Sequence, residues 1–556
     1  MQLLSLFKDI TLHPKNAEEL KGLILQFAVL GKLTSNWRDE NNKTSSADEL
    51  LDNIIAHNSE QLALKKRRIK KLSIKPDSVL DLPSNWVQTK NHVLFSLSKG
   101  KNPKDLSEAV KKYPYQDIES LARGNVRRYS DDEKAPKCSV NDILVVCDGS
   151  RSRLVLDGKD GIVGSTLAII ETPPFIQDYI KILFLQGYQK ANSNMKGAAI
   201  PHLDTKSLLA SDIGLPPLEE QKAIVEVVSE LFTEVEQLEE LTKKRISLKE
   251  DFATSALQRL TQTDNTTVEW NFLQQHFSSF FTEKPNVKKL RETILQLAVQ
   301  GKLTAKWRSA NPSVEEASEL LNRIEAEKQQ LIAEKKIKKE KQLPPIEDRD
   351  KPYELPARWV WCRMGEIAAK LGAGSTPSGG KTAYIDDGIM FFRSQNIHNY
   401  YLKLQEVAYI PEDTHKRMKG TKVRPKDLLL NITGGSIGRC ALTPDNFDTA
   451  NVSQHVAIVR MIELETRKYM HQFILSPWFQ EKIMDVQVGV SREGLSMTKL
   501  KLFPVPLPPL EEQQAIVEKV NAMMSLCDEL EEQIGKSEEQ IEQLMQSCLR
   551  EVFEKA

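Results

Sequence analysis

The sequence predicts an α+β protein in which two globular domains are separated by two long antiparallel coiled-coil helices, with an internal pseudo-two-fold duplication. The first observation behind this fold class is that LPPLEEQKAIVE at 215–226 returns as LPPLEEQQAIVE at 507–518, where only Lys222 becomes Gln514. The second is that LKGLILQFAVLGKLTSNWR at 20–38 reappears as LRETILQLAVQGKLTAKWR at 290–308. Self-similarity over so long a distance indicates two domain-sized halves, because solenoid repeats are much shorter.

A third echo marks where the globular parts begin, since LPSNWV at 82–87 returns as LPARWV at 355–360. Between these markers and the LPPLEEQ segments the two halves barely resemble each other, and short apolar runs alternate with Gly, Pro and Asn turns, which is typical of strands. We therefore divide the chain into five segments. They are an N-terminal helical connector at 1–81, a globular domain at 82–214, a central helical region at 215–354 with a long helix at 216–260 and a helical hairpin at 286–341, a second globular domain at 355–506, and a C-terminal coiled-coil helix at 507–556.

Each LPPLEEQ segment is typical of a helix start. Proline fits the first turn, and the glutamates that follow face the positive end of the helix dipole. Apolar residues then recur in alternating steps of four and three, which predicts a coiled-coil seam. The predicted seam residues are Ile224, Val228, Leu231, Val235 and Leu238 in the central helix and Ile516, Val520, Met523, Cys527, Leu530 and Ile534 in the C-terminal helix. Two such helices in one chain most simply pair with each other; the alternative is that each recruits a separate partner.

The composition separates the globular parts from the helices. The whole chain carries 77 basic and 77 acidic residues, but the globular regions have a basic excess and the long helices an acidic one. Phosphate binding is therefore expected on the globular parts. The six cysteines show no CxxC spacing, so we expect reduced thiols and no zinc site. No apolar run is long enough for a bilayer, which predicts a cytoplasmic protein without a membrane partner.

This combination of motifs resembles the specificity subunit of Type I restriction-modification systems. Two dissimilar domains, each introduced by LPxxW and closed by LPPLEEQxAIV, are joined by duplicated helices, and the resemblance covers essentially the whole chain. The second globular domain adds GAGSTPSGG at 372–380, GIMFFRSQNI at 388–397 and DLLLNITGGSIGRCAL at 427–442. The resemblance implies that each globular domain is a target recognition domain that reads one half of a bipartite DNA sequence.

The resemblance also implies the partners. They are double-stranded DNA, two methyltransferase (modification) subunits docked on the conserved helices, and restriction/translocase subunits. The family's specificity subunit is not an enzyme, so no catalytic residue, metal or cofactor is expected on this chain. S-adenosylmethionine, and ATP with magnesium, are expected on the partner subunits.

Candidate DNA-binding residues are the polar side chains that match base edges or phosphates and follow apolar runs. In the first domain they are Lys99, Lys101, Lys104, Arg123, Asn125, Arg127, Arg128, Arg151 and Arg153. In the second domain they are Ser375, Thr376, Arg393, Gln395, Asn396, Asn431, Thr433, Ser436, Arg439, Asn451, Gln454 and His455. Three polar loops of the second domain are expected to converge on one groove. The alternative for any single Asn or Ser is that it caps a turn by bonding its own backbone.

Two functions of other classes compete with DNA recognition. One is a duplicated coiled-coil scaffold whose diverged domains bind ligands other than nucleic acid. The other is an enzyme hidden in one globular domain. For the enzyme, the segment 374–382 has the wrong spacing for a phosphate-binding P-loop. TPPF at 172–175 has threonine where an adenine methyltransferase needs Asp, Asn or Ser.

Overall fold

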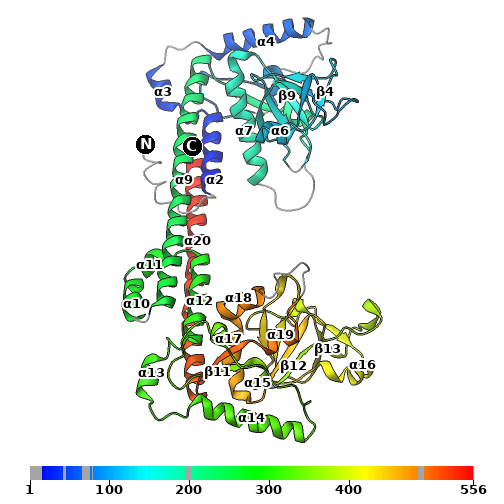
Figure 1. Ribbon diagram of the computed structural model, residues 1–556. Coiled ribbons are helices and arrows are strands. Elements are labelled where there is room, and N and C mark those ends of the chain that lie inside the picture. The colour runs from blue at the N-terminus through cyan, green and yellow to red at the C-terminus, as the bar shows by residue number, and fades with distance from the viewer. Residues whose placement is uncertain are drawn as a thin grey trace. The chain divides into compact units, whose positions relative to one another are not determined.

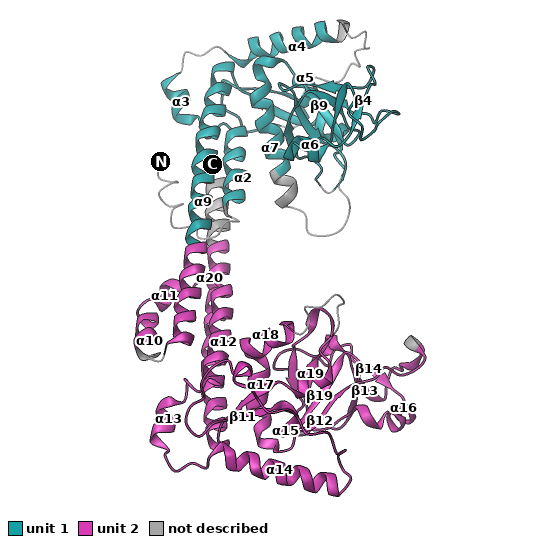
Figure 2. Cartoon of the chain, in the orientation of Figure 1, with its two compact units in different colours: residues 1–246, 544–556 teal, residues 247–543 magenta. Residues whose placement is uncertain are grey.

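The computed structural model describes residues 16–41, 46–64, 76–77, 79–149, 151–193, 202–263, 266–485 and 494–554. The chain divides into two compact units, one made of residues 1–246 with 544–556 and the other of residues 247–543 (Figure 2). Each unit holds one globular domain with its helical frame. None of the helices in the described part of the chain is both long and apolar enough to cross a membrane.

The first globular domain consists of two four-stranded sheets and a two-stranded ribbon (Figure 1). The ribbon pairs β1 (Val87–Lys90) with β10 (Asp212–Leu215), so the two ends of the domain meet. One sheet has the order β2-β9-β6-β7 and the other β4-β3-β8-β5, in which β3 and β8 run parallel. The strands of the two sheets are β2 (Ser96–Lys99), β3 (Tyr113–Gln116), β4 (Tyr129–Ser130), β5 (Lys137–Cys138), β6 (Ile143–Val146), β7 (Val155–Asp157), β8 (Gly161–Val163) and β9 (Leu167–Glu171).

The second globular domain repeats this topology strand for strand. Its ribbon is β11-β20, and its sheets have the orders β12-β19-β16-β17 and β14-β13-β18-β15, again with one parallel pair, β13 and β18. The strands are β11 (Val360–Arg363), β12 (Ala368–Ala373), β13 (Ile389–Phe392), β14 (Ala408–Ile410), β15 (Lys422–Val423), β16 (Leu428–Asn431), β17 (Cys440–Leu442), β18 (Ala450–Val452), β19 (Val456–Met461) and β20 (Pro504–Leu507). Two sequences with little resemblance therefore adopt one topology.

The central strands fold this way because they are apolar on both faces. All four residues of β6 and of β16 are buried, and each strand has neighbours on both sides in its sheet. Such runs suit the middle of a sheet covered on both faces. The five cysteines whose side chains are described are buried and free, as the sequence predicts.

The helices form the frame. In the first unit they are α2 (Asn16–Val29), α3 (Ser35–Glu40), α4 (Ala47–Leu64), α5 (Asn91–Leu94), α6 (Ile118–Arg123), α7 (Gln177–Ser193), α8 (Thr205–Ala210) and the start of α9 (Leu218–Gln262). The second unit contains the end of α9 and α10 (Thr266–Gln275), α11 (Phe277–Phe280), α12 (Lys284–Val299), α13 (Ala305–Ala310), α14 (Ala317–Ala333), α15 (Met364–Ile367), α16 (Glu412–Arg417), α17 (Arg467–Leu475), α18 (Pro477–Asp485), α19 (Met497–Lys501) and most of α20 (Leu510–Glu554).

Both predicted long helices are present, and each has 45 residues. The expected helical hairpin at 286–341 is correct only in part, because α14 ends at Ala333 and the basic segment that follows is not helical. A residue with positive φ, Lys335, lies just beyond that end. The first half has an equivalent basic run at residues 65–71, which falls outside the described residues.

The predicted seam residues lie on the buried side of each long helix. In the first unit Ile224 and Val228 share a core with Leu25 and Ala28 of α2, and Val235 shares one with Leu20. In the second unit the α20 seam shares a core with α12. Heptad spacing predicts that the two long helices pair with each other or that each binds a separate partner. Each long helix has, in addition, the amphipathic helix of its own half.

The direction of the helices in the second unit follows from their contacts. Arg291 of α12 bonds Asp528, whereas Lys284, about two turns earlier, bonds Glu538, so α12 and α20 are antiparallel. Lys289 pairs with Glu250, and the later Lys302 donates to the carbonyl of Thr261, so α12 is parallel to the end of α9. The end of α9 therefore runs antiparallel to α20 within this unit (Figure 1).

The three echoed motifs meet at one buried carboxylate in each unit. In the second unit Glu512 of the LPPLEEQ segment accepts from Thr304 Oγ1 at 2.7 Å, from Arg308 Nη2 at 2.9 Å and from Trp359 Nε1 at 2.9 Å. In the first unit Glu220 accepts from Thr34, Arg38 and Asn85. Because Thr and Arg belong to GKLTxxWR and Trp359 to LPxxW, the motifs recur together as one cluster, which fixes the start of the long helix to its globular domain.

The glycine of GKLTxxWR is required by the same cluster. Gly301 has φ +70°, and a β-carbon there would lie 2.6 Å from Pro356 Cγ and 3.0 Å from the Trp359 ring. Gly31 has φ +68° and the corresponding approach to Pro83 and Trp86. A left-handed backbone and a close approach both favour glycine. The Pro and Trp of LPxxW thus pack on the end of the amphipathic helix.

Candidate nucleic-acid interface

In the second domain the predicted polar loops converge at one end of the two sheets. The amide of Ser375, after β12, donates to the carbonyl of Val452 at 3.1 Å. Asn431, at the end of β16, donates to the carbonyl of Ser394 at 2.9 Å. Thr433 Oγ1 and His455 Nδ1 lie 2.6 Å apart. The loops that follow β12, β13, β16 and β18 are therefore in mutual contact.

Three of the candidate asparagines are buried and bond within the domain. The side chain of Asn396 accepts a hydrogen bond from the backbone amide of Arg393 and donates one to the carbonyl of Lys403. Asn431 also donates to Ser436 Oγ. Asn451 donates to Thr421 Oγ1 and contacts His415. These side chains hold the loops in place, which is the turn-capping role expected as the alternative.

The other candidates of the second domain are reachable from solvent. Arg393, in the loop after β13, is half-buried and donates to the carbonyl of Glu406, and Thr433 and Ser436, in the loop after β16, are half-buried as well. Five exposed candidates surround them: Ser375, Thr376, Gln395, Arg439 and Gln454, with His455 exposed next to Thr433. The surface thus offers guanidinium, amide, hydroxyl and imidazole groups, which suit base edges and phosphates alike.

The first domain brings its loops together through the same backbone contacts. The amide of Gly100 donates to the carbonyl of Leu167, as that of Gly374 does to Val456. A β-carbon on Gly100 would lie 2.2 Å from the Gly164 carbonyl, and one on Gly374 2.1 Å from that of Val452. At each of these two glycines another stretch of backbone passes so close that no side chain would fit, and we call this contact the glycine crossing.

Most of the first domain's candidate residues are open to solvent. Lys101, Lys104, Asn125, Arg127 and Arg151 are exposed, and Arg153 is half-buried with φ +73°. Arg123 is paired with Glu119 one helical turn away. Arg128 bonds Asp117 at 3.0 Å and lies 4.7 Å over the Tyr115 ring, whose hydroxyl donates to Asn102.

The structure adds two residues that sequence reasoning missed, Asp148 and His202. Lys99 Nζ lies 2.9 Å from one carboxylate oxygen of Asp148, and His202 Nδ1 lies 3.0 Å from the other. The hydrogen bond from Lys99, and then that from His202, lower the pKa of Asp148, while the same bond raises the pKa of Lys99. Both groups of the pair are thus charged at neutral pH. Their position directly after the buried strand β6 was the available signal.

Comparison with known proteins bears directly on this arrangement. The family described as "Type I restriction modification DNA specificity domain" matches residues 83–248 and 356–543. The chain belongs to this family. The EcoAI specificity subunit of Escherichia coli is 27% identical over 92% of this chain and 90% of its own length. The EcoEI specificity subunit of Escherichia coli is 26% identical over 94% and 91%.

A solved structure titled "Structural basis underlying complex assembly and conformational transition of the type I R-M system" is also similar, with a TM-score of 0.47, 15% identity and coverage of 85% of this chain and 99% of that one. As a member of the specificity family, the chain is a DNA-recognition subunit of a Type I restriction-modification system and is not itself an enzyme. The scaffold and hidden-enzyme alternatives are not favoured.

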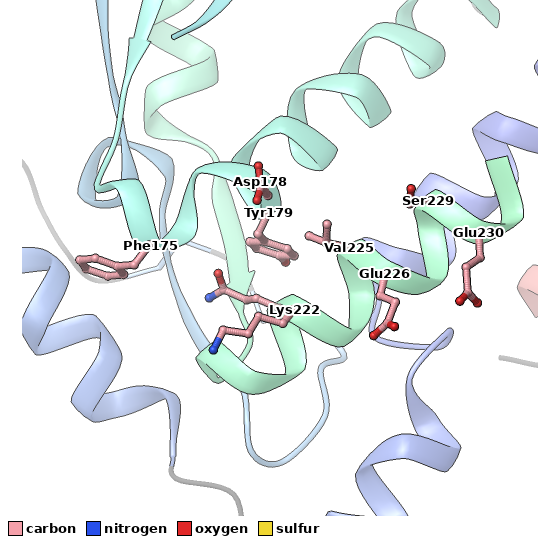
Figure 3. A pocket seen from close by; sticks show the side chains of 9 residues that line it. Phe175, Asp178, Tyr179, Lys222, Val225, Glu226, Ser229 and Glu230 are labelled. Atoms are coloured by element: carbon pink, nitrogen blue, oxygen red, sulfur yellow. The ribbon is translucent and has the colours of Figure 1, made fainter. Parts of the chain in front are cut away.

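A pocket of about 390 Å³ in the specificity subunit's first unit lies away from the converging loops. Figure 3 shows Glu226, Ser229 and Glu230 along α9 and Asp178 and Tyr179 on α7, with Lys222 at the start of α9. Three carboxylates against one ammonium make the pocket acidic, so it repels phosphate. Among the described residues no cluster of three His, Cys, Asp or Glu side chains could hold a metal ion.

A larger groove of about 1440 Å³ lies in the second unit between α12, α13 and α20. Trp307 of the GKLTxxWR motif lines it, together with Met523, Leu526 and Leu530 of α20 and Trp270 of α10. Leu526 is 63% exposed. The groove combines these apolar side chains with Lys306, Glu518 and other charges at its rim.

Proposed function

We propose that this specificity subunit reads a bipartite DNA target, with one recognition domain per half-site. The observation that carries the proposal is that two domains of the same strand order place different exposed residues on the same loop frame. A protein that reads two different sequences needs that combination. The division into domains at 82–214 and 355–506 remains part of this proposal.

The exposed residues at the loop ends are proposed to contact DNA. In the first domain, the exposed cations suit phosphates, because charge neutralisation dominates affinity there; they are Lys101, Lys104, Arg127 and Arg151. In the second domain the mixture of Arg439, Gln454 and His455 suits base edges as well. The buried asparagines act indirectly by fixing loop geometry. Positioning of this kind is as necessary for recognition as the contacts themselves.

We further propose that methyltransferase subunits dock on the duplicated frame. Support comes from the groove of the second unit, whose apolar lining and polar rim fit the anatomy of a protein–protein interface. Trp307 is repeated as Trp37 in the first half, which fits two identical partners. Restriction/translocase subunits, S-adenosylmethionine on the methyltransferase, and ATP with magnesium on the translocase complete the proposed complex, which acts in the cytoplasm.

Tethering explains why two modest half-sites suffice. When two binding domains share one chain, binding of the second becomes intramolecular and the combined affinity exceeds either alone. The length of α9 and α20 is proposed to set the distance between half-sites, since a 45-residue helix is about 65 Å long. Shortening both helices by two heptads should change the spacer and leave both half-sites unchanged.

The proposed function is tested by co-expressing the chain with the methyltransferase of its restriction-modification system in a host that lacks adenine methylation. Mapping methylated adenines across the genome should yield two short conserved sequences separated by an unspecified spacer of fixed length. Omitting the chain should abolish methylation. A continuous consensus, or methylation without the chain, would contradict the proposal.

A further inference from the structure

The Lys99–Asp148 ion pair occupies one defined place on a frame that both domains share. The amide of Cys147 donates to Thr166 O at 2.8 Å, as that of Ile432 does to His455 O at 3.0 Å. Cys147 and Ile432 therefore hold equivalent positions, and the residues that follow them, Asp148 and Thr433, correspond. Gly100 and Gly374 make equivalent backbone hydrogen bonds, so the residues before them, Lys99 and Ala373, also correspond.

The two domains differ chemically at this place. The first has a carboxylate between an ammonium and an imidazole, whereas the second has the neutral Thr433 hydroxyl bonded to His455. The backbone hydrogen bonds around this place are the same in both domains, so the fold does not require different side chains here. Exposed ion pairs contribute only about 0–1 kcal/mol, and the Lys99 side chain is 60% exposed. Stability is thus a poor explanation for the pair.

A carboxylate is also unfavourable for phosphate binding. Asp148 pairs with Lys99 in a domain whose candidate DNA contacts include the exposed cations Lys101 and Arg151, and a negative charge among such contacts weakens attraction to the DNA backbone. Its side chain is nevertheless 33% exposed. An acceptor at such a position suits a base-edge amino group, which phosphate-binding cations cannot read.

We propose that Lys99 and Asp148 together read one C·G base pair in the half-site bound by the first domain. Resting on the proposed function, this names the base pair that the site selects. In the major groove cytosine presents the N4 amino donor, and guanine presents the O6 and N7 acceptors. Asp148 accepts from N4, and Lys99 donates to O6 or N7.

An A·T pair fits this site less well. Adenine presents the N7 acceptor beside its N6 amino group, so a carboxylate that accepts from N6 faces the lone pair of N7. Thymine offers Lys99 the single O4 acceptor in place of two, with a methyl group beside it. His202, on the other side of Asp148, keeps the carboxylate oriented.

The test uses the chain co-expressed with its methyltransferase and genome-wide mapping of methylated adenines. Wild type should show an invariant C·G pair in one half-site. Asp148→Asn replaces one acceptor with an amide donor, and asparagine pairs with adenine N6 and N7. The variant should therefore accept A·T at that one position, with preference for C·G falling roughly tenfold or more. The other half-site and the spacer should not change.

Matched variants separate the outcomes. Thr433→Val, at the corresponding place of the second domain, should alter only the other half-site, and Lys99→Met should relax the same position as Asp148→Asn. Where a variant methylates too weakly to map, binding to consensus duplexes with that C·G pair replaced gives the same comparison. Unchanged discrimination by both first-domain variants, or a change at a position that is not C·G, overturns this inference alone. A wild type without a bipartite consensus overturns the proposed function instead.

Discussion

The carboxylate of Glu512 accepts two hydrogen bonds from the guanidinium of Arg308, from Nε at 3.0 Å and from Nη2 at 2.9 Å. The Glu512 side chain is 1% exposed, so this pair joins the start of α20 to α13 inside the second unit. The same guanidinium also donates to the carbonyl of Gly301 at 2.6 Å. One arginine thus ties the long helix to the end of the amphipathic helix.

Replacing Glu512 by Gln should strongly destabilise the second unit. The variant leaves the Arg308 charge without its counter-ion in a mostly buried site, and breaking a buried pair costs about 3–5 kcal/mol. Urea unfolding of the full chain, followed by tryptophan fluorescence, measures the loss, and Trp359 lies within the cluster. Glu511→Gln is the matched control because Glu511 is exposed on the adjacent position. Equal midpoints for the two variants would contradict the role of the pair.

Two glycines of the second unit should respond in opposite directions to alanine. Gly301→Ala places a side chain at φ +70° and 2.6 Å from Pro356, which should lower the free energy of unfolding by more than about 1 kcal/mol. Gly535→Ala, within α20 and with open space around it, should raise that free energy by about 0.5–1 kcal/mol. Thermal melting of both variants checks the signs. A neutral Gly301→Ala would argue against the packing of LPxxW on this turn.

The sequence could predict the frame because its motifs are written twice. The echoes predicted the two long helices, and heptad spacing predicted the seam on their buried side. Glu220 and Glu512 were interpreted only as acids that complement a helix dipole. Their role as buried acceptors depends on Thr34, Arg38 and their counterparts, which are distant in sequence. The glutamate, the threonine, the arginine and the LPxxW segment recur together in both halves, and this repetition was the signal for that contact.

The individual site residues were harder to predict, since residue type does not reveal burial. Asn396, Asn431 and Asn451 have the chemistry of base readers, yet their side chains are buried and hold loops. Asp148 was passed over because a search for basic and amide groups omits acids. The loops of the second domain contact one another, as expected from their place after apolar strands, and their convergence on one DNA-binding groove stays a prediction. Which side chain of each loop reaches solvent depends on tertiary packing.

Lys101→Met should weaken DNA binding evenly across sequences. Its side chain is exposed beside the glycine crossing, and losing one phosphate contact lowers the slope of log affinity against log salt by about 0.9. Binding of the chain with its methyltransferase to duplex DNA, measured from low to physiological salt, reports the slope. Lys222→Met in the acidic pocket is the control and should leave the slope unchanged. A changed consensus for Lys101→Met would indicate base reading instead.

Lys370 should make the stability of the second domain depend on pH in the alkaline range. Burial, and then the neighbouring Arg460, lower the pKa of Lys370 from 10.5 to about 8. Below pH 8 the folded domain carries the full cost of the partly buried charge. Between pH 8 and 10.5 the folded state releases this proton before the unfolded state does, so the stability contribution rises with pH. The stabilising effect of Lys370→Met should therefore shrink over this window. Urea unfolding at pH 7.5 and 9.5 checks it, and an equal difference at both pH values would contradict the shift.

Leu526→Glu should prevent the methyltransferase from binding to the second unit. Leu526 is 63% exposed in the groove that Trp307 and Met523 also line, and a buried carboxylate without a partner disrupts an apolar contact. Because the leucine is exposed in the free chain, the substitution should leave folding intact. Co-purification of the tagged chain with the methyltransferase should show fewer bound copies, and methylation should fall.

Leu464→Glu is the matched control for this surface. Leu464 is 40% exposed in the second globular domain and lies outside the groove, so the same change of charge should leave the bound methyltransferase unaffected. If Leu526→Glu binds as many copies as this control, the docking surface lies elsewhere on the helices. If both variants lose binding, the loss comes from the added charge in general and not from the groove, because a local interface would be disturbed by Leu526→Glu alone.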